Sequence, residues 1–291
     1  TYKVDVNISD VDGDSLTLSI DTNDTNLTIT PNFTNPIMQG NYDGVTLDFN
    51  ITSKFNITKN IRVSLLVNDT DKNDTASFDV NVTNTAVTHN GTTYGYAISP
   101  STGKVWLDRN LGASQACTDL NDSACFGDYY QWGRYIDGHE KNNSSTTNIL
   151  ATNVLNVGHG DFVILNTDWT NNDDSGTIRK ERLTSIDASF ICPIGFRVPS
   201  IVEFRDETIN ASGNLQVNNS SDAINSFLKL PPAGLRQNTI GSMSGVLSSG
   251  NYWTNFGYGN IAVMFTFDKY HVTTYAQTIS SYGLSIRCIK D

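Results

Sequence analysis

Two stretches near the end of the chain decide its fold, CPIGFRVPS at residues 192–200 and GLSIRCIKD at residues 283–291. Each contains one cysteine, in a Cys-Pro pair in the first and in an Arg-Cys pair in the second. Four further motifs accompany them: VWLDRNLGAS (105–114), GDYYQWGR (127–134), LKLPPAGLR (228–236) and NYWT (251–254). The first third of the 291 residues has no such motif, and a chain of this length can form two cores. We therefore predict two domains, residues 1–87 and residues 88–291.

The order, spacing and cysteine contexts of the six motifs closely resemble those of the FISUMP domain, a paralogous family of secreted and surface-anchored microbial proteins. The resemblance covers about two thirds of the chain. It implies that residues 88–291 form an α+β domain with a C-type-lectin-like fold, and that the protein lies outside the cell. The family has no well-defined common activity, so the resemblance implies a location and an architecture rather than a reaction.

Residues 1–87 show the alternating pattern of half-buried strands. Apolar residues take every second position within residues 2–8, 16–20, 27–29, 45–49 and 78–82. Period two places one face of a strand in the core and the other in water. In residues 61–67 the apolar side chains crowd together, which predicts a more central strand. Short strands separated by turn-forming residues favour a β-sandwich, and NISDVDGDSLTLSI (7–20) resembles cadherin-like and immunoglobulin-like surface repeats. The predicted fold is thus β-rich, a β-sandwich followed by the α+β lectin-like domain.

The second domain is predicted to begin with a hairpin, whose strands at 92–98 and 104–107 flank a turn at 99–103. The clearest helix covers residues 200–208, where Ser200 and Glu203 match a capping box. A second short helix is expected at 221–228, and residues 119–130 and 185–188 are expected to be helical or irregular. Strands return from residue 252, notably at 261–267 and 284–289.

The chain is acidic, and its charge is unevenly distributed. Its net charge is −11, and residues 1–87 hold 5 Lys and Arg against 12 Asp, a net charge of −7. A surface without a basic cluster repels phosphate backbones, which argues against nucleic acids and anionic membranes as partners. No apolar run is long enough for a transmembrane helix. The chain opens on Thr1 without a signal segment, so a secreted protein would be in a mature or trimmed form here.

All four cysteines, Cys117, Cys125, Cys192 and Cys288, lie in the second part of the chain. No Cys-x-x-Cys pair occurs and no histidine stands close to any of them, which argues against a zinc site. Two disulfides, with three connectivities open, indicate an oxidising compartment, and four buried free thiols are the alternative. Cys117 and Cys125 flank a short polar loop that a bridge can close. The lectin-like resemblance implies the Cys192–Cys288 pair.

Signatures of common enzyme classes are absent from the sequence. It has no Gly-x-Ser-x-Gly, His-Glu-x-x-His or Gly-Lys-Ser/Thr motif, and His89, His139, His159 and His271 are scattered. Formylglycine-generating enzymes share the lectin-like fold and bind copper through cysteines, so a related catalyst is a minor alternative. We expect no enzymatic activity, and calcium is the one candidate cofactor.

Two acidic clusters in the first domain are candidate calcium sites. Oxygen ligands at alternate positions around a glycine turn suit this hard cation, although the twelfth-position Glu of an EF-hand is missing. The candidates are Asp10, Asp12, Asp14, Asp69 and Asp71, with Asp74 beside the second cluster. A solvated acidic turn is the alternative.

Aromatic residues in two motifs are candidates for stacking on a sugar. Calcium-dependent lectins present Glu-Pro-Asn or Gln-Pro-Asp together with Trp-Asn-Asp, and this chain has neither set. Trp132 and Trp253, with Tyr129, Tyr130 and Tyr252, could still contact a sugar face. A position in the core is the alternative for all five, and it is the more common one for such residues.

Sequons for N-linked glycosylation, Asn-x-Ser/Thr, are more frequent before residue 91 than composition alone predicts, which favours a glycan-coated surface domain. There they lie at Asn7, Asn23, Asn26, Asn32, Asn50, Asn56, Asn68, Asn73, Asn81 and Asn90. Later sequons lie at Asn121, Asn142, Asn143, Asn210, Asn218 and Asn219. The alternative is that an Asn- and Thr-rich turn composition inflates the count.

These features favour an extracellular, non-enzymatic structural protein, a subunit of a surface assembly or filament. Residues 2–8 form an apolar stripe on a terminal strand, and an edge strand without a partner invites pairing with another chain. Copies of the protein are therefore expected partners, joined head to tail by β-strand addition. The alternatives are a monomer whose first strand pairs within its own domain, and an adhesin whose lectin-like domain binds a glycan or a surface protein.

Overall fold

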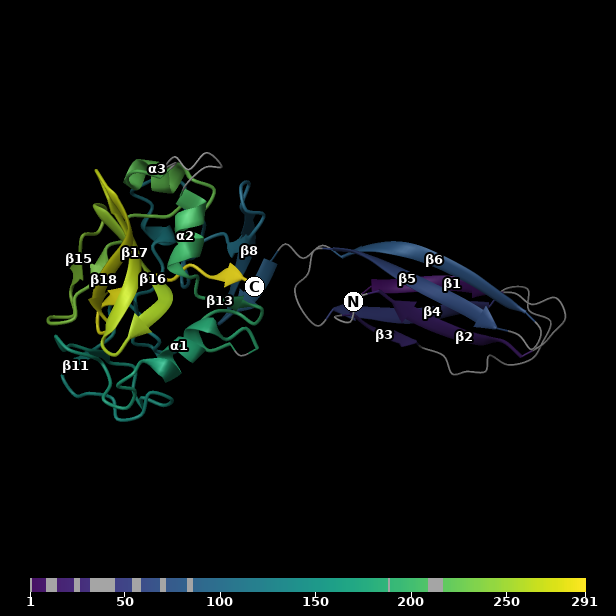
Figure 1. The fold of residues 1–291 in the computed structure, drawn as a ribbon, viewed down its shortest axis with the longest axis horizontal. Helices are drawn as coiled ribbons and strands as arrows, with labels where there is room; N and C mark the ends of the chain where they lie inside the picture. The colour runs from purple at the N-terminus through teal and green to yellow at the C-terminus, as the bar shows by residue number, and fades with distance from the viewer. Residues whose placement is uncertain are drawn as a thin grey trace. The chain divides into compact units, whose positions relative to one another are not determined.

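The computed structural model describes residues 2–8, 15–23, 27–31, 45–53, 59–68, 72–82, 86–187, 189–208 and 217–291. The chain divides into two compact units, Thr1–Thr85 and Ala86–Asp291 (Figure 1). The second unit starts two residues before the boundary predicted after Val87, because strand β7 (Ala86–His89) pairs with β8 (Thr92–Ile98). Both units are rich in β-structure, as predicted.

The described part of the first unit forms two three-stranded antiparallel sheets (Figure 1). One has the order β1-β4-β3, from Tyr2–Ile8, Val45–Ser53 and Leu27–Pro31. The other has the order β2-β5-β6, from Thr17–Thr22, Lys59–Asn68 and Asn73–Val82. The apolar crowding in residues 61–67 correctly predicted that β5 is the central strand. On this sheet Leu18, Val63 and Leu65 are buried while their neighbours along the strand are more exposed, which is the expected period of two.

Strand β1 pairs with β4 over all seven of its residues, from Tyr2 opposite Ile51 to Ile8 opposite Val45. The strand expected to pair with another molecule thus has a complete partner in its own chain. An exchange with a neighbour would have to break this whole ladder. Among the described strands β4 is its one partner, so β1 remains at the edge of its sheet.

The second unit joins its beginning and its end in one sheet. This five-stranded sheet has the order β13-β20-β9-β8-β7, with β13 at Phe196–Arg197, β20 at Ile289–Lys290 and β9 at Val105–Leu107. Strands β8 and β9 form the predicted hairpin. A three-stranded antiparallel sheet has the order β16-β17-β18, at Ser249–Tyr258, Ile261–Asp268 and Val272–Ile279. Smaller sheets are β10-β19-β14-β15 (Tyr130–Gln131, Gly283–Leu284, Leu235–Arg236, Met243–Ser244) and the parallel pair β11-β12 (Thr146–Thr147, Phe162–Val163).

Helix α2 (Ile201–Thr208) begins at the predicted capping box. The Glu203 N–H donates to Ser200 Oγ at 3.2 Å, and the Ser200 N–H donates to Glu203 Oε2 at 2.8 Å. Helix α3 (Ser220–Asn225) is shorter than the predicted 221–228 and ends before Ser226, whose hydroxyl donates back to the carbonyl of Ala223.

Two segments of the second unit differ from the prediction. Helix α1 (Thr177–Thr184) was not predicted, because it buries Arg179 and Arg182 beside Leu183 and so lacks an apolar stripe. The strand expected at 284–289 is divided into β19 and β20, since residues 285–288 pass through the core between two sheets. Of the segment 119–130, a single 3-10 turn, η1 (Ser123–Cys125), is helical.

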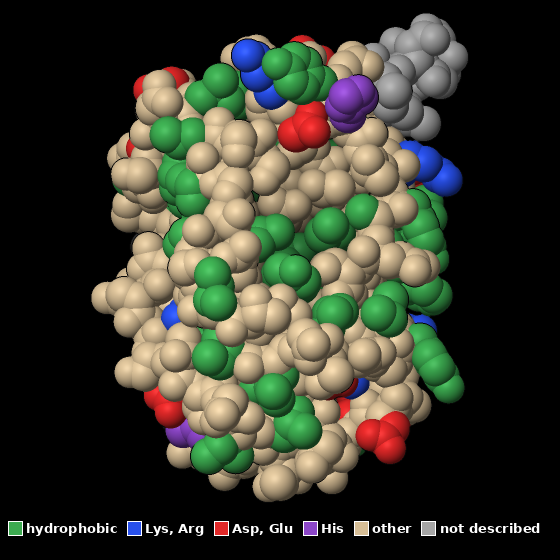
Figure 2. Space-filling view, turned by 90° about the vertical axis from the view of Figure 1, so that its left-hand side faces the viewer, with side chains coloured by type: hydrophobic (Ala, Val, Ile, Leu, Met, Phe, Trp, Pro, Cys, Tyr) green, Lys and Arg blue, Asp and Glu red, His purple; other side chains and the backbone are tan. Residues whose placement is uncertain are grey.

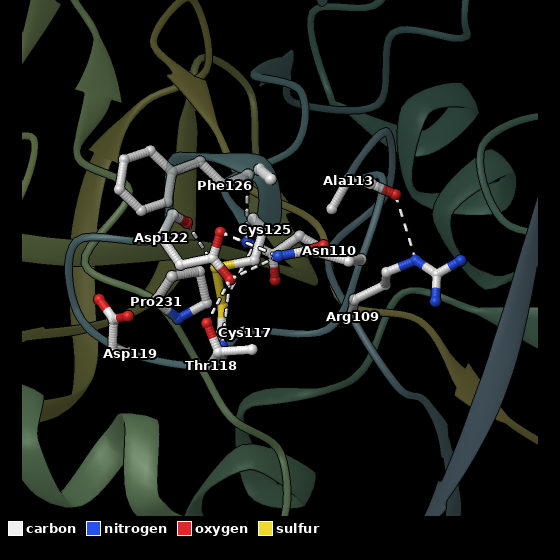
Figure 3. The surroundings of a disulfide bond; sticks show 12 residues. Arg109, Asn110, Ala113, Cys117, Thr118, Asp119, Asp122, Cys125, Phe126 and Pro231 are labelled. Carbon is white, nitrogen blue, oxygen red and sulfur yellow. Dashed lines mark hydrogen bonds between the residues drawn. A yellow bond between two sulfur atoms is a disulfide. The ribbon is translucent and has the colours of Figure 1, made fainter.

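Both expected disulfides are present, Cys117–Cys125 and Cys192–Cys288. The first closes a loop ordered by Asp122, whose carboxylate accepts hydrogen bonds from the backbone and the hydroxyl of Thr118 (Figure 3). The second lies in the main core and links the segment before β13 to the segment before β20. Because its two sulfur atoms are bonded to each other, neither cysteine offers a thiolate to copper while the disulfide is intact. No helix in the described residues is long and apolar enough to span a membrane.

Candidate functional site

An open groove of about 700 Å³ lies at one end of the sheet β16-β17-β18. One side of the groove is formed by the β16–β17 turn with Val263 of β17 and Gln277 of β18. The other side comes from the irregular segments around Leu150 and residues 167–174. Segments more than a hundred residues apart thus meet around one space, as is usual for ligand-binding sites.

Two aromatic side chains stand exposed on the β16 side of this groove. Phe256 is 47% exposed and Tyr258 is 76% exposed. They occupy alternate positions of β16, so both side chains point to the same face of the strand. Gly257 lies between them over Trp132, whose ring atoms would be 2.7 Å from any Cβ at that position. Gly259 supplies the positive φ of +58° that the turn requires. The buried indole ring therefore supports the hairpin that presents the two aromatic rings.

Polar side chains with planar amide or carboxylate groups surround the aromatic pair. The groove is lined by the amides of Asn171, Asn260 and Gln277 and by the carboxylates of Asp168 and Asp174. Amides both donate and accept hydrogen bonds, whereas ionised carboxylates accept only. The groove thus combines flat apolar surface with many directional polar groups.

Arg179 of α1, which is fully buried, holds both sides of the groove together. Its Nη1 donates to Asp168 Oδ1 at 2.8 Å, and its Nη2 donates to the carbonyl of Gly259 at 2.9 Å. Its Nε donates to Asp173 Oδ2 at 3.1 Å. The guanidinium also lies over the rings of Trp132 and Trp169, with centroids 5.4 and 5.7 Å away. One buried cation therefore fixes both the 167–174 segment and the turn that carries Tyr258.

A second polar cluster, Asp137, His139 and Glu140, has potential metal-ligating atoms within 4.8 Å of one another. Both ring nitrogens of His139 are already used, since Nδ1 lies 2.7 Å from Asp137 Oδ1 and Nε2 accepts from the Gln131 N–H at 3.1 Å. Burial lowers the pKa of His139 to about 4, with Arg134 acting in the same direction and Asp137 opposing it. The lone pair of Nε2 already accepts a hydrogen bond and Nδ1 faces the Asp137 carboxylate, so His139 would have to give up a buried contact before it could bind a metal.

The expected ligand aromatics are in the core instead. Trp132 and Trp253 are fully buried, and their indole N–H groups donate to the carbonyls of Thr254 and Tyr130. The ligand-contacting role considered for them does not hold, because no solute can reach either ring. Tyr129, Tyr130 and Tyr252 are likewise at most 2% exposed. Phe256 and Tyr258 were not predicted as site residues, although the run Phe-Gly-Tyr-Gly-Asn marks a turn at which an aromatic residue is exposed.

The candidate calcium ligands Asp10, Asp12, Asp14, Asp69 and Asp71 lie outside the described residues, and Asp74 is exposed at the start of β6. Sequon asparagines with exposed side chains are Asn23, Asn68, Asn73, Asn90, Asn121, Asn142, Asn143 and Asn218. Asn219 is half-buried, and its Oδ1 accepts hydrogen bonds from two N–H groups at the start of α3. Asn7, Asn50 and Asn81 lie on strands, and Asn26, Asn32, Asn56 and Asn210 lie outside the described residues.

The side of the second unit that carries β15 and β18 has few Lys and Arg side chains, which are scattered toward its edges (Figure 2). This face offers no basic patch to an anionic polymer, in agreement with the acidic composition. Comparisons of the chain with protein-family models, with curated proteins and with solved structures found no match. The resemblances to the FISUMP domain and to cadherin-like or immunoglobulin-like repeats therefore stay predictions that rest on sequence motifs.

Proposed function

We propose that this protein is an extracellular, non-enzymatic adhesin whose second unit binds carbohydrate in the groove beside Tyr258. The observation that carries the proposal is the pairing of the exposed Phe256 and Tyr258 rings with planar amides in one preformed groove. A pyranose ring has an apolar face of C–H groups and an edge of hydroxyl groups. Flat aromatic rings match the first and amides match the second, so the groove suits a sugar better than a purely apolar ligand.

Asp168, one of the two carboxylates in the lining, has contacts that suit a binding site. Asp168 accepts hydrogen bonds from Arg179, from Ser280 Oγ at 2.6 Å and from the Trp169 N–H at 2.7 Å. These contacts fix the wall of the groove, which lowers the entropy lost when a ligand binds.

The wider assignment rests on several features of the chain. Two disulfides are compatible with an oxidising, extracellular compartment. We assign the second unit to a C-type-lectin-like FISUMP domain because its motifs resemble that family and β20 returns to β9. Two antiparallel sheets support an immunoglobulin-like or cadherin-like sandwich for the first unit. Its exposed sequons, such as Asn23 and Asn73, support a glycosylated spacer.

The proposal is tested with the full-length protein on a glycan array, followed by titration of the best-binding oligosaccharide. Tyr258→Ala should weaken binding about tenfold or more, because it removes the most exposed ring of the groove. Tyr270→Ala is the matched control, since Tyr270 is 71% exposed and lies on the β17–β18 turn, outside the groove. Equal binding by the wild type and Tyr258→Ala, or no binding to any glycan, would rule out this function.

A second candidate is a homopolymeric surface filament. It is favoured by the position of β1, a seven-residue strand at the edge of its sheet. An edge strand can pair with a strand of another copy without leaving β4. Light scattering of native material distinguishes the two functions, since a filament subunit forms large assemblies and a monomeric adhesin gives a mass near 31.9 kDa plus any glycan.

A further inference from the structure

The charged side chains that line the groove are both acidic. Asp168 and Asp174 contribute carboxylates, and no Lys or Arg belongs to the described lining. Outside this lining, the Nζ of Lys180 lies 5.9 Å from the centroid of the Phe256 ring. The lining itself therefore has no cation that would attract an anion.

The two carboxylates differ in whether a positively charged partner contacts them. The charge of Asp168 is matched by Arg179, which contacts both of its oxygens at 2.8 and 3.0 Å. Asp174 is exposed, and its carboxylate has no hydrogen bond or ion pair with any described residue. Its backbone carbonyl lies beside Gly259, so its position along the groove wall is set by the same turn that carries Tyr258. The groove lining thus contains one carboxylate that no described side chain pairs with.

This charge acts on an anionic ligand at short range. The apolar side chains of Phe256, Ile261 and Val263 form part of the surrounding wall and offer no charge to offset it. A sulfate or carboxylate in the groove would also find amides and hydroxyls among the lining side chains to replace its water, but no lining cation. Uncharged sugar hydroxyls have no such cost, and they can donate hydrogen bonds to Asp174.

We propose that the groove selects uncharged glycans against sulfated or carboxylated ones, and that Asp174 is the residue that determines this selectivity. The inference rests on the proposed function and deepens it by naming the class of ligand. Such selection does not require contacts specific to one sugar, because the repulsive carboxylate itself distinguishes charged from uncharged glycans.

The test uses the full-length protein with named probes. Neutral oligosaccharides of galactan, mannan and xylan are compared with polygalacturonate and dextran sulfate, at low and at moderate salt. The wild type should bind at least one neutral probe and should bind the anionic probes at least about tenfold more weakly. The difference should shrink as salt is raised, because the repulsion is screened over about 10 Å at 0.1 M.

Asp174→Asn keeps the shape of the side chain and removes its charge. We expect this variant to bind anionic probes about 3- to 10-fold more tightly than the wild type, and neutral probes within about twofold. Asp187→Asn is the matched control, because Asp187 is an exposed carboxylate outside the groove lining. It changes the net charge equally and should leave both classes of probe unaffected.

The outcomes separate the inference from the proposed function. If anionic probes bind as tightly as neutral ones while Tyr258→Ala still weakens binding, the selectivity is overturned and the glycan-binding function stands. An equal gain in Asp174→Asn and Asp187→Asn assigns the exclusion to net charge and overturns the role of Asp174. Absence of binding to every probe overturns both.

Discussion

Arg179 and Asp168 form a two-point contact beneath the groove, in which Nη1 of the arginine donates to both carboxylate oxygens, at 2.8 and 3.0 Å. The arginine is fully buried and has further partners in Asp173 and Gly259. A buried cation is stable only when its partners are all in place. The wall and the aromatic turn of the groove are therefore held in one arrangement, so that little ordering remains for a ligand to impose.

Replacing Arg179 should destabilise the second unit and disorder the groove. Arg179→Met leaves the carboxylates of Asp168 and Asp173 without their cation, which costs about 3–5 kcal/mol. All four tryptophans, Trp106, Trp132, Trp169 and Trp253, lie in the second unit, so urea unfolding followed by tryptophan fluorescence reports on that unit.

Arg205→Met is the control for this replacement, because Arg205 is an arginine on α2 whose side chain is 51% exposed and which pairs with Asp206. It should change the free energy of unfolding by less than about 0.5 kcal/mol. A similar small change in Arg179→Met would contradict the role given to the buried arginine.

Acid should destabilise the second unit through His139. Its pKa in the folded protein is about 4, because of burial, and its ordinary value is 6.5. Between pH 6.5 and pH 4 the unfolded chain therefore binds a proton that the folded protein does not. The free energy of unfolding should fall as the pH is lowered through this window, by about 3 kcal/mol in total.

The measurement is urea unfolding by tryptophan fluorescence at pH 7, 5.5 and 4.5. His139→Gln keeps a donor and an acceptor in the side chain and removes the titration, so its stability should depend less on pH. His89 is retained in this variant, and burial lowers its pKa as well, so part of the slope should remain. Identical slopes for the wild type and His139→Gln would show that another group causes the acid sensitivity.

Features set by local chemistry were predicted well from the sequence. Alternation of apolar residues identified the strands of the first unit, because in a sheet the side-chain period directly reports burial. The start of α2 was predicted by Ser200 and Glu203, since a capping box involves only neighbouring residues. The Cys117–Cys125 bridge followed from the shortness of its loop.

Features set by long-range packing were not predicted. Helix α1 was not predicted because the residues it buries include two arginines, and the partners that allow Arg179 to be buried, among them the aspartates at 168 and 173, lie outside the helix. The NYWT motif drew attention to Trp253, yet the exposed aromatic residues follow a few positions later on the same strand. The core packed beneath the sheet determines which aromatic residue of β16 is exposed to solvent. The sequence of the strand alone does not reveal this.

Glycan mapping should distinguish two overlapping sequons at the start of α3. Asn218 is exposed, whereas Asn219 is half-buried and its Oδ1 caps the helix through the N–H groups of Ser221 and Asp222. We expect Asn218 and the exposed sequons of the first unit to carry glycans, with Asn219 bare. The check is glycopeptide mass spectrometry before and after enzymatic deglycosylation. An intact mass equal to that of the bare chain would refute glycosylation altogether.

Removing the long disulfide should destabilise the second unit more than removing the short one. Cys192 and Cys288 are separated by 96 residues, and Cys117 and Cys125 by 8. On the loop-entropy model a bridge stabilises by restricting the unfolded chain, by about 4–5 kcal/mol for the long loop and about 2–3 kcal/mol for the short one. The Cys192→Ala/Cys288→Ala and Cys117→Ala/Cys125→Ala double variants are the matched pair, since each removes two buried sulfur atoms. Tryptophan fluorescence in urea should give a lower midpoint for the first variant. The reverse order would mean that the short bridge stabilises chiefly through the folded loop around Asp122, where the Thr118 contacts depend on it.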